Sequence, residues 1–410
     1  MQTSSVDFLI IGGGILGAAT AWALAQRVPA GTRIRLIEAG MLSAATTSQA
    51  AALLTRVRPD AAMAALVGET FAAIAELNSV LNEPLPLRQA GSLHLATGVA
   101  GRSYLHETAK TAEQLDLSVD WLSAARIRAM SPWLQPGANG QALFLAEDGY
   151  MDPVQFAQGY LAAARRLGVE ITQHCRVQHL LVEQGRVVGV RTSRGDIHSD
   201  SVICCAGPWA LPLLARHGVA LAMAPVRSHY WISAENPELF PAGSPMVILP
   251  DASAYARPEV GGLLFGLRDQ QAVYGDPASL PEDIHGYRFN CDPDGWECLE
   301  NGYGALAEVF PALAHLGIAH YISGVSSYTP DGKPLLGATG IPGLLVATGC
   351  SGGGIALSGG IGRLLAELAL EQPPFTDPTP FSLDRFGPVD PFSESFRIRC
   401  AEARSQKRSG

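Results

Sequence analysis

The first forty residues carry the clearest pattern of apolar and small positions in the chain. Residues 8–11 form an apolar run of the length of a buried strand. Residues 15–26 continue as small and apolar positions of helical length, and residues 34–37 form a second apolar run. The pattern predicts strand, glycine turn, helix and strand, which is the order of an α/β unit.

The apolar periodicity of the remaining chain alternates between helix and strand. Helices are expected at residues 61–81, 102–117, 153–166, 297–309 and 356–369. Strands are expected at residues 88–96, in a series within 169–207, and at residues 225–232, 246–249, 254–257 and 262–267. A second glycine turn precedes the last of these helices, which predicts one binding domain interrupted by another. The polar residues after 385 are expected to form a frayed tail.

Three glycines in the first turn match the spacing G-x-G-x-x-G of a dinucleotide site. Gly12 allows the tight turn, Gly14 lets the backbone approach a pyrophosphate, and Gly17 lets the helix pack on the strand. The helix begins at Ile15, and Leu16 follows. The N–H groups and the positive dipole end of this first turn point at that phosphate.

An acidic residue follows the second strand where such a site needs one. Glu38 lies about 20 residues after Gly17, where its carboxylate can accept both ribose hydroxyls, and Ala39 follows it. A signal peptide or a membrane helix is the alternative for residues 8–25, which are largely apolar. The interrupting glycines and the strand directly afterwards argue against that alternative.

The loop after the second strand is rich in small and hydroxyl-bearing residues. Thr46, Thr47 and Ser48 offer donors to a phosphate, and the small residues permit close approach of a ligand. The alternative is that the hydroxyls cap the next helix, and the two roles are compatible.

Composition limits the partners and the class of protein. The chain has 410 residues, enough for two domains, and its 47% hydrophobic residues and 44 glycines are typical of a well-buried α/β enzyme. The net charge of −9 argues against nucleic acid or an anionic membrane as a partner. The seven cysteines form neither a C-x-x-C pair nor a metal-spaced array. We therefore expect no metal site and a protein with reduced thiols, either free in the cytoplasm or peripheral to the inner face of the membrane.

Seven motifs together resemble the FAD-dependent D-amino-acid oxidase superfamily over nearly the whole chain. They are the opening fingerprint, AATTSQAAALL, GYMDP, VICCAGPW, YARPE, SSYTPDGKPLLG and VATGCSGGGIALSGGIG. The stretches TPDGKPLLG and PFSLDRF make the chain most similar to one branch of that superfamily. This branch contains the sarcosine oxidase β-subunits, the dimethylglycine and sarcosine dehydrogenases, and the opine and proline dehydrogenases.

The resemblance implies an α/β fold with a discontinuous Rossmann-like FAD-binding domain and an inserted α+β substrate domain built on an antiparallel sheet. The FAD domain is expected at residues 1–87, 146–222 and 320–371, the substrate domain at 88–145 and 223–319, and a tail at 372–410. The implied reaction is oxidation of a C–H bond next to an amine nitrogen, with hydride passing to the flavin and the imine hydrolysing in water. The substrate would be a small amine or amino acid. The electron acceptor would be a quinone, an electron-transfer protein or oxygen.

Further cofactor contacts are expected where small residues let the backbone pass a flat ligand and where the resemblance implies them. These positions are Gln49, Val177, Ala206, Gly207, Trp209, Gly324, Asp331, Gly349, Ser351, Gly352, Gly353, Gly354 and Ile355. The covalent anchors of some relatives, a histidine and a cysteine, correspond here to Gln49 and Gly324. We therefore expect FAD to be bound non-covalently.

The substrate-binding positions depart from the family pattern. The arginine that clamps a substrate carboxylate in many relatives corresponds to Ser326, and the lysine of monomeric sarcosine oxidases corresponds to Ala356. The candidates to replace them are Arg56, Tyr255, Arg257, which shares the strand face of Tyr255, and His229. Each has a structural alternative, namely a solvated charge, a sheet-surface residue or a satisfied core histidine.

Three interpretations of the function are open at this point. The favoured one is an FAD-dependent dehydrogenase or oxidase of an amine or amino acid. Within it a dehydrogenase is favoured, because Leu264 stands where monomeric sarcosine oxidases have the lysine that promotes reaction with oxygen. The second is a flavoprotein subunit that needs the partner subunits of a heteromeric complex. The third is a nicotinamide-dependent dehydrogenase on the same fold.

Overall fold

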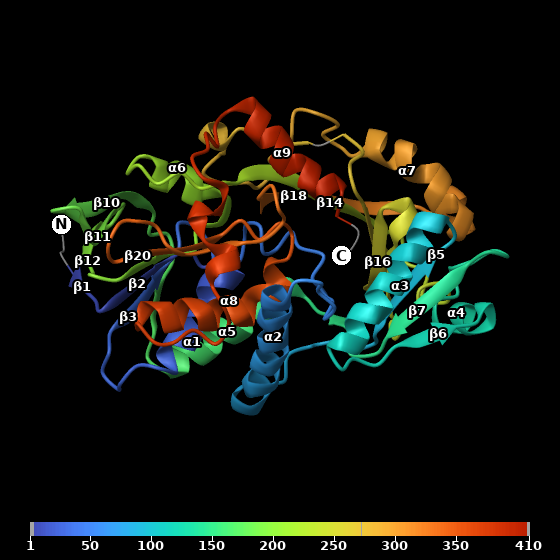
Figure 1. Ribbon diagram of the computed structural model, residues 1–410, viewed down its shortest axis with the longest axis horizontal. Coiled ribbons are helices and arrows are strands. Elements are labelled where there is room, and N and C mark those ends of the chain that lie inside the picture. Colours follow the sequence, from blue (N-terminus) through green and yellow to red (C-terminus); the bar gives the residue numbers. More distant parts are fainter. Residues whose placement is uncertain (1–3, 272, 408–410) are drawn as a thin grey trace.

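The structure is a computed structural model that describes residues 4–271 and 273–407. Two halves lie side by side in Figure 1, one built around a six-stranded sheet with its helices and the other around an eight-stranded sheet. Both halves contain segments from distant parts of the sequence, because the chain crosses between them several times.

The six-stranded sheet forms the centre of the first half. Its order is β19 (Leu335–Ala338), β20 (Leu344–Thr348), β13 (Val202–Cys204), β2 (Phe8–Ile11), β3 (Ile34–Ile37) and β9 (Glu170–Thr172). All neighbours pair in parallel except β19 and β20. The apolar run of β2 is buried on both faces, since Ile10 packs in one core and Leu9 and Ile11 in the other. This burial explains a continuous apolar run rather than an alternating one.

Helices cover one face of this sheet and a smaller sheet covers the other. The helical layer consists of α1 (Ile15–Ala25), α5 (Pro153–Arg166) and α8 (Gly354–Ala369), with α2 (Ala61–Val80) packed on α8. The opposite layer consists of β1 (Ser4–Ser5), β12 (Gly195–His198), β11 (Arg186–Thr192), β10 (Val177–Glu183) and α6 (Ala210–Ala215). Helix α5 starts as expected, since the Asp152 side chain accepts a hydrogen bond from the Gln155 N–H and Pro153 is the first helical residue.

Helix α2 is the one helix among the described residues that is long and apolar enough to cross a membrane. Its residues Leu66, Val67 and Ile74 are buried in the core that α1, α5 and α8 share. Its apolar character is accounted for by this packing.

The eight-stranded sheet carries the second half. Its order is β18 (Ile318–Tyr328), β14 (Ala224–Ser233), β17 (Gly262–Leu267), β16 (Ala254–Glu259), β15 (Met246–Leu249), β5 (Ser92–Ala96), β7 (Gln141–Leu145) and β6 (Asp120–Leu122). All neighbours are antiparallel except β15 and β5. The sheet is flanked by α3 (Val99–Gln114), α4 (Ala124–Met130) and α7 (Trp296–Val309), and a two-stranded sheet of β4 (Leu53–Leu54) and β8 (Gly149–Tyr150) adjoins it. The mixed α/β architecture expected from the sequence is confirmed.

The frayed tail expected after residue 385 is wrong for the residues that the structure describes. Helix α9 (Glu394–Ser405) runs across β14 and β18 in Figure 1. Phe396, Cys400 and Ala401 are buried against Ala224 and Tyr328. These three apolar residues form one helical face, and the charged residues around them hide it in the sequence. The last residues of the expected tail, 408–410, lie outside the described part.

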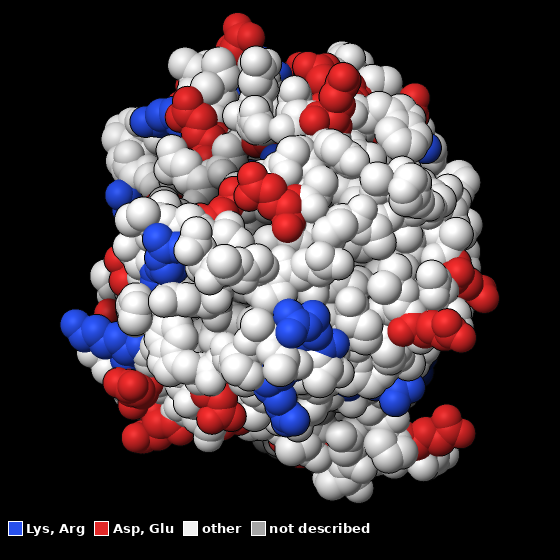
Figure 2. Space-filling view, turned by 90° about the vertical axis from the view of Figure 1, so that its right-hand side faces the viewer, with Lys and Arg blue, Asp and Glu red and all other residues white. Residues whose placement is uncertain are grey.

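Charged side chains are mixed on the surface that Figure 2 shows. Acidic and basic residues are interspersed over a mostly uncharged face on the side of the second half.

Candidate active site

A cavity of about 1230 Å³ is lined by residues from both halves of the protein. The first half contributes the glycine turn after β2, the end of β3 and the start of α8. The second half contributes residues of β14, β16 and β18. Segments that are far apart in the sequence thus meet at one concave site, which is where ligands typically bind.

The first glycine turn can be formed by glycine alone. Gly12 has a φ of +104°, and a Cβ atom there would lie 2.5 Å from the carbonyl oxygen of Cys205. A Cβ atom on Gly17 would lie 1.9 Å from the carbonyl oxygen of Gly12. Gly12, Gly14, Ile15 and Leu16 line the cavity, whereas Gly17 packs behind the turn.

Glu38 holds the edge of this site from the end of β3. Its Oε2 atom accepts a hydrogen bond of 2.7 Å from the Gly13 N–H, and its Oε1 atom accepts one of 2.8 Å from the Gly40 N–H. Glu38 and Ala39 both line the cavity. The backbone donors fix the carboxylate beside the glycine turn, in the position expected for ribose binding.

The hydroxyl-rich loop contacts the start of α1. Thr47 Oγ1 accepts a hydrogen bond of 3.0 Å from the Ile15 N–H, and Thr46 Oγ1 donates one of 2.7 Å to the Val325 carbonyl. Both threonines line the cavity, whereas the Ser48 hydroxyl points to Ala44 O within its own turn. The loop does not cap the next helix, because α2 is capped by the Asp60 side chain.

The second glycine turn brings the start of α8 to the same cavity. Gly349, Gly352, Gly354 and Ile355 line it. Ser351 and Gly353 lie outside the lining, and the buried Ser351 hydroxyl contacts Thr329. Asp331 also lies outside, because it pairs with Arg385 at 2.9 Å. The N–H groups at the start of α8 give the cavity a positive dipole end.

The remaining expected cofactor positions lie in the cavity wall. Val177, Ala206, Gly207 and Trp209 line it, and the Trp209 indole donates to the Pro281 carbonyl at 2.9 Å. Gln49 and Gly324 face each other, since a Cβ atom on Gly324 would lie 2.9 Å from the Gln49 Cβ.

Of the four candidate substrate residues, Tyr255 lines the cavity. Arg56 and Arg257 do not. The Arg56 guanidinium lies 4.6 Å from the centre of the Phe71 ring. Arg257 donates to the Ala51 carbonyl at 2.7 Å and pairs with Glu259, so its hydrogen-bonding capacity is directed along the sheet.

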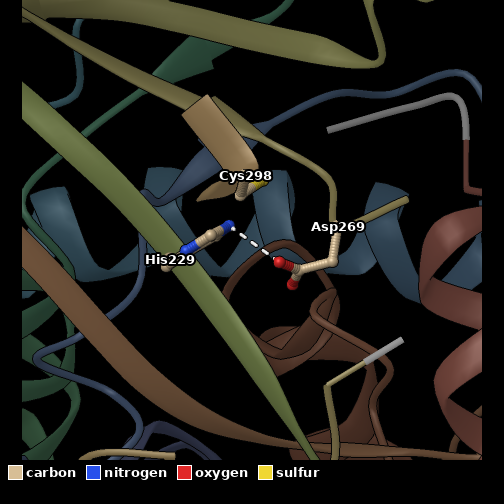
Figure 3. A group of neighbouring side chains, drawn as sticks. All are labelled: His229, Asp269 and Cys298. Atoms are coloured by element: carbon tan, nitrogen blue, oxygen red, sulfur yellow. Dashed lines mark ion pairs between the residues drawn. The ribbon is translucent and has the colours of Figure 1, made fainter. Parts of the chain in front are cut away.

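His229 also lies outside the cavity lining, in the buried group that Figure 3 shows with Asp269 and Cys298. Its Nε2 atom is 3.6 Å from Asp269, and its Nδ1 atom is 3.0 Å from the Tyr321 hydroxyl. Burial lowers the pKa of His229 to about 3, so the ring is neutral at neutral pH.

The same three residues have the ligand types of a metal site, but Asp269 already pairs with a cation. The Arg227 guanidinium contacts its carboxylate, and Arg404 lies 4.0 Å from it. Two guanidinium groups beside the Asp269 carboxylate oppose the binding of a metal ion there. His229, Asp269 and Cys298 are therefore described as part of a buried ion-pair cluster, in which Asp269 carries the negative charge.

Comparison with known proteins identifies the family. The chain matches the DAO family, described as FAD dependent oxidoreductase, over residues 7–368. The protein belongs to this family. The 4-methylaminobutanoate oxidase (formaldehyde-forming) of Paenarthrobacter nicotinovorans is 29% identical over 385 residues, which cover 93% of this chain and 46% of that protein.

Two further similar proteins have names that describe different roles. The mitochondrial pyruvate dehydrogenase phosphatase regulatory subunit of Mus musculus is 24% identical over 404 residues, covering 97% of this chain and 45% of that protein. The chain therefore spans about half the length of these curated relatives. The crystal structure of L-proline dehydrogenase from P. horikoshii superimposes with a TM-score of 0.79 at 20% identity, over 94% of this chain and 98% of that one. This last likeness concerns the fold.

FAD, the cofactor of the DAO family, fits the residues of the cavity. The turn at Gly12 and Gly14, the fixed Glu38 carboxylate and the start of α8 are arranged around one space. In addition, Gln49 Oε1 is buried without a hydrogen-bond partner among the described residues, which is expected of a group that contacts a ligand.

We predict that the protein is yellow and releases its flavin intact on acid denaturation. Gln49 and Gly324, at the two anchor positions, offer no nucleophile to the flavin, and Cys350 is the cysteine of the adjacent turn. Burial raises the pKa of the Cys350 thiol to about 12, so it is not a thiolate at neutral pH. The test is to precipitate the protein with acid and measure flavin absorbance in the supernatant. Yellow colour retained in the pellet would contradict the prediction.

Three basic residues of the cavity wall are not predicted from the sequence. Arg268 follows β17, while Arg404 and Lys407 come from α9 and the residues after it. Arg404 and Lys407 belong to residues 372–410, for which the sequence predicts a tail, and no motif marks Arg268. The apolar spacing of Phe396, Cys400 and Ala401 is the signal that predicts this helix.

Proposed function

We propose that this DAO-family protein oxidises the C–H bond next to the nitrogen of an amino acid or N-substituted amine, giving an imine that hydrolyses in water. The observation that carries the proposal is that one cavity is lined by the glycine turn at Gly12, the start of α8 and the eight-stranded sheet. The name of the oxidase relative, which acts on an N-methylated amino acid, agrees with it.

In this proposal the residues of the chain bind the cofactor and the substrate and orient them. The turn at Gly12 and the start of α1 receive the pyrophosphate, and Glu38 receives the ribose. Bound FAD supplies the hydride acceptor. The positive end of α8 would stabilise negative charge that develops on the bound cofactor, and Tyr230 and Tyr255 of the eight-stranded sheet also line the cavity.

A second candidate function is that of a subunit that depends on partner proteins. It is favoured by the similarity to a regulatory subunit and by the half-length match to both curated relatives. Gel filtration of the lone chain together with the activity assay separates this function from the first.

The test of the proposed reaction is anaerobic reduction of the purified, FAD-loaded protein. Amino acids, N-methylated amino acids and simple amines are added in turn, and flavin absorbance is followed. We expect at least one to bleach the flavin and to yield the carbonyl product of imine hydrolysis. If dithionite bleaches the flavin and no amine does, the proposed activity of the lone chain is wrong.

We further propose that the protein is a dehydrogenase rather than an oxidase. Leu264 is buried in an apolar cluster with Tyr230 and Tyr255, so this part of β17 offers no cation to stabilise superoxide. After anaerobic reduction by substrate, mixing with air-saturated buffer is expected to reoxidise the flavin more slowly than turnover with a quinone or dye. Reoxidation as fast as turnover, with stoichiometric peroxide, would contradict this.

A further inference from the structure

The cavity wall carries a group of basic side chains in addition to the glycine turn at Gly12 and the Glu38 carboxylate. Arg404 and Lys407 reach it from the C-terminal helix, and Arg268 lies in the same lining. They lie near Tyr328 and the turn at Gly352, since a Cβ atom on Gly352 would lie 2.7 Å from the Tyr328 hydroxyl and 3.6 Å from the Lys407 Nζ. The pyrophosphate turn at Gly12 belongs to a different part of the lining.

Arg404 has only part of its charge matched by the protein. Its Nη1 donates to the Tyr328 hydroxyl at 3.4 Å and its Nη2 to the Leu267 carbonyl at 3.5 Å. Its Nε is 4.0 Å from Asp269 and has no hydrogen-bond partner within the described ranges. Asp269 in turn pairs with Arg227, so two buried guanidinium groups share this carboxylate, and Arg227 also pairs with Asp292 at 3.2 Å.

Lys407 is held at the cavity by a neutral partner. Its Nζ donates to the Ser351 carbonyl at 3.2 Å. Burial, together with Arg268, Arg58 and Arg404, lowers the pKa of Lys407 well below its usual value. The neighbouring guanidinium groups thus oppose protonation of Lys407, and an anion placed between them would favour the protonated form.

The acidic residues of the cavity lining are engaged elsewhere. Glu38 accepts backbone hydrogen bonds from the first glycine turn, and Glu282 lies 3.5 Å from Arg176. The third, Asp283, caps its own turn by accepting from the His285 N–H. Among the described residues, none of the three has an interaction with Arg404 or Lys407.

We propose that Arg404 and Lys407 bind the carboxylate of the substrate, so that the substrate is an anionic amine, an amino acid or an N-substituted amino acid. This inference rests on the proposed function and names its substrate class. Ser326 and Ala356 line the same cavity and cannot pair with a carboxylate, whereas the C-terminal helix supplies the charge that they lack. Helix α9 and the residues directly after it would then determine which substrates bind.

The experiment uses the full-length, FAD-loaded protein and carboxylates of known chemistry. Acetate and malonate are titrated by calorimetry and by flavin absorbance, with acetamide and malonamide as uncharged probes. The variants are Lys407→Gln and Arg404→Gln. The matched control is Arg399→Gln, which removes an exposed arginine of the same helix.

We expect malonate to bind the wild type and the control equally, and at least tenfold more weakly in Lys407→Gln. The uncharged amides are expected to bind none of the proteins. Lys407→Gln keeps the inference falsifiable if Arg404→Gln fails to fold, because Lys407 lies beyond the last residue of α9. Retention of FAD is expected to be the same in Lys407→Gln as in the control.

Equal malonate affinity in Lys407→Gln and wild type, or equal affinity for malonate and malonamide, would overturn the inference. Failure of the proposed function looks different. In that case no amine bleaches the flavin anaerobically, whatever the carboxylate titration shows. If an amine bleaches the flavin and its amino-acid counterpart does so no better, the carboxylate assignment is wrong and the proposed reaction stands.

Discussion

Replacing Gly12 by alanine is expected to destabilise the protein by more than about 3 kcal/mol and to abolish retention of FAD. The new methyl group would lie 2.5 Å from the carbonyl oxygen of Cys205, which is fixed at the end of β13, and the residue would keep a φ of +104°. Both the left-handed conformation and the clash with fixed backbone oppose alanine. Chemical denaturation and the flavin-to-protein absorbance ratio measure the two effects.

Gly31→Ala is the matched control for Gly12→Ala. Gly31 has a φ of +90°, but a Cβ atom there would meet nothing within 4 Å. Its replacement is expected to cost about 1 kcal/mol and to leave FAD binding unchanged. Equal costs for the two variants would mean that the close approach at Gly12 does not determine the turn.

Replacing Asp269 by asparagine is expected to destabilise the protein by roughly 3–5 kcal/mol. The Asp269 side chain is 4% exposed and the Arg227 side chain is 1% exposed, so the variant leaves a buried guanidinium with less compensating charge. Although burial opposes its ionisation, the hydrogen bond and charge of Arg227 and the charge of Arg404 lower the pKa of Asp269. The free energy of unfolding in urea at pH 7 is the measurement.

Asp196→Asn is the matched control, because it removes an ion pair that is exposed to solvent rather than buried. Asp196 pairs with Arg191 at 3.0 Å, and the Arg191 side chain is 54% exposed. This variant is expected to leave the free energy of unfolding nearly unchanged, because solvent screens an exposed ion pair. A cost for Asp269→Asn no larger than that of the control would show that the buried pair is not a significant source of stability.

The first half of the fold could be predicted because its signals are local. The strand, turn and helix around Gly12 follow from apolar runs and glycine spacing, and β2, β3 and the start of α5 lie where the sequence placed them. The fold class and FAD as cofactor, both inferred from the motifs, are confirmed by the family match. These features depend on residues that are neighbours in the sequence.

The substrate side could not be predicted because it is assembled from distant segments. Arg56 and Arg257 were chosen by position in a motif, yet Arg56 lies against Phe71 and Arg257 bonds to Ala51. Lys407 reaches the cavity only because α9 packs on β14 and β18, a contact that depends on a short apolar face among charged residues. The strands β6 and β7 are not predicted for a similar reason, since they form by pairing with other strands: β7 pairs with β5, and β6 pairs with β7.

The central claim, oxidation of a C–H bond next to nitrogen in this cavity, is tested most directly by isotope substitution. The substrate that bleaches the flavin best is prepared with deuterium on the carbon next to nitrogen and, as a control, on a carbon further away. Flavin reduction is followed at saturating substrate without oxygen. We predict that only the first substitution slows reduction, by severalfold, because that C–H bond breaks in the step. Equal rates for the unlabelled and both labelled substrates would contradict the account.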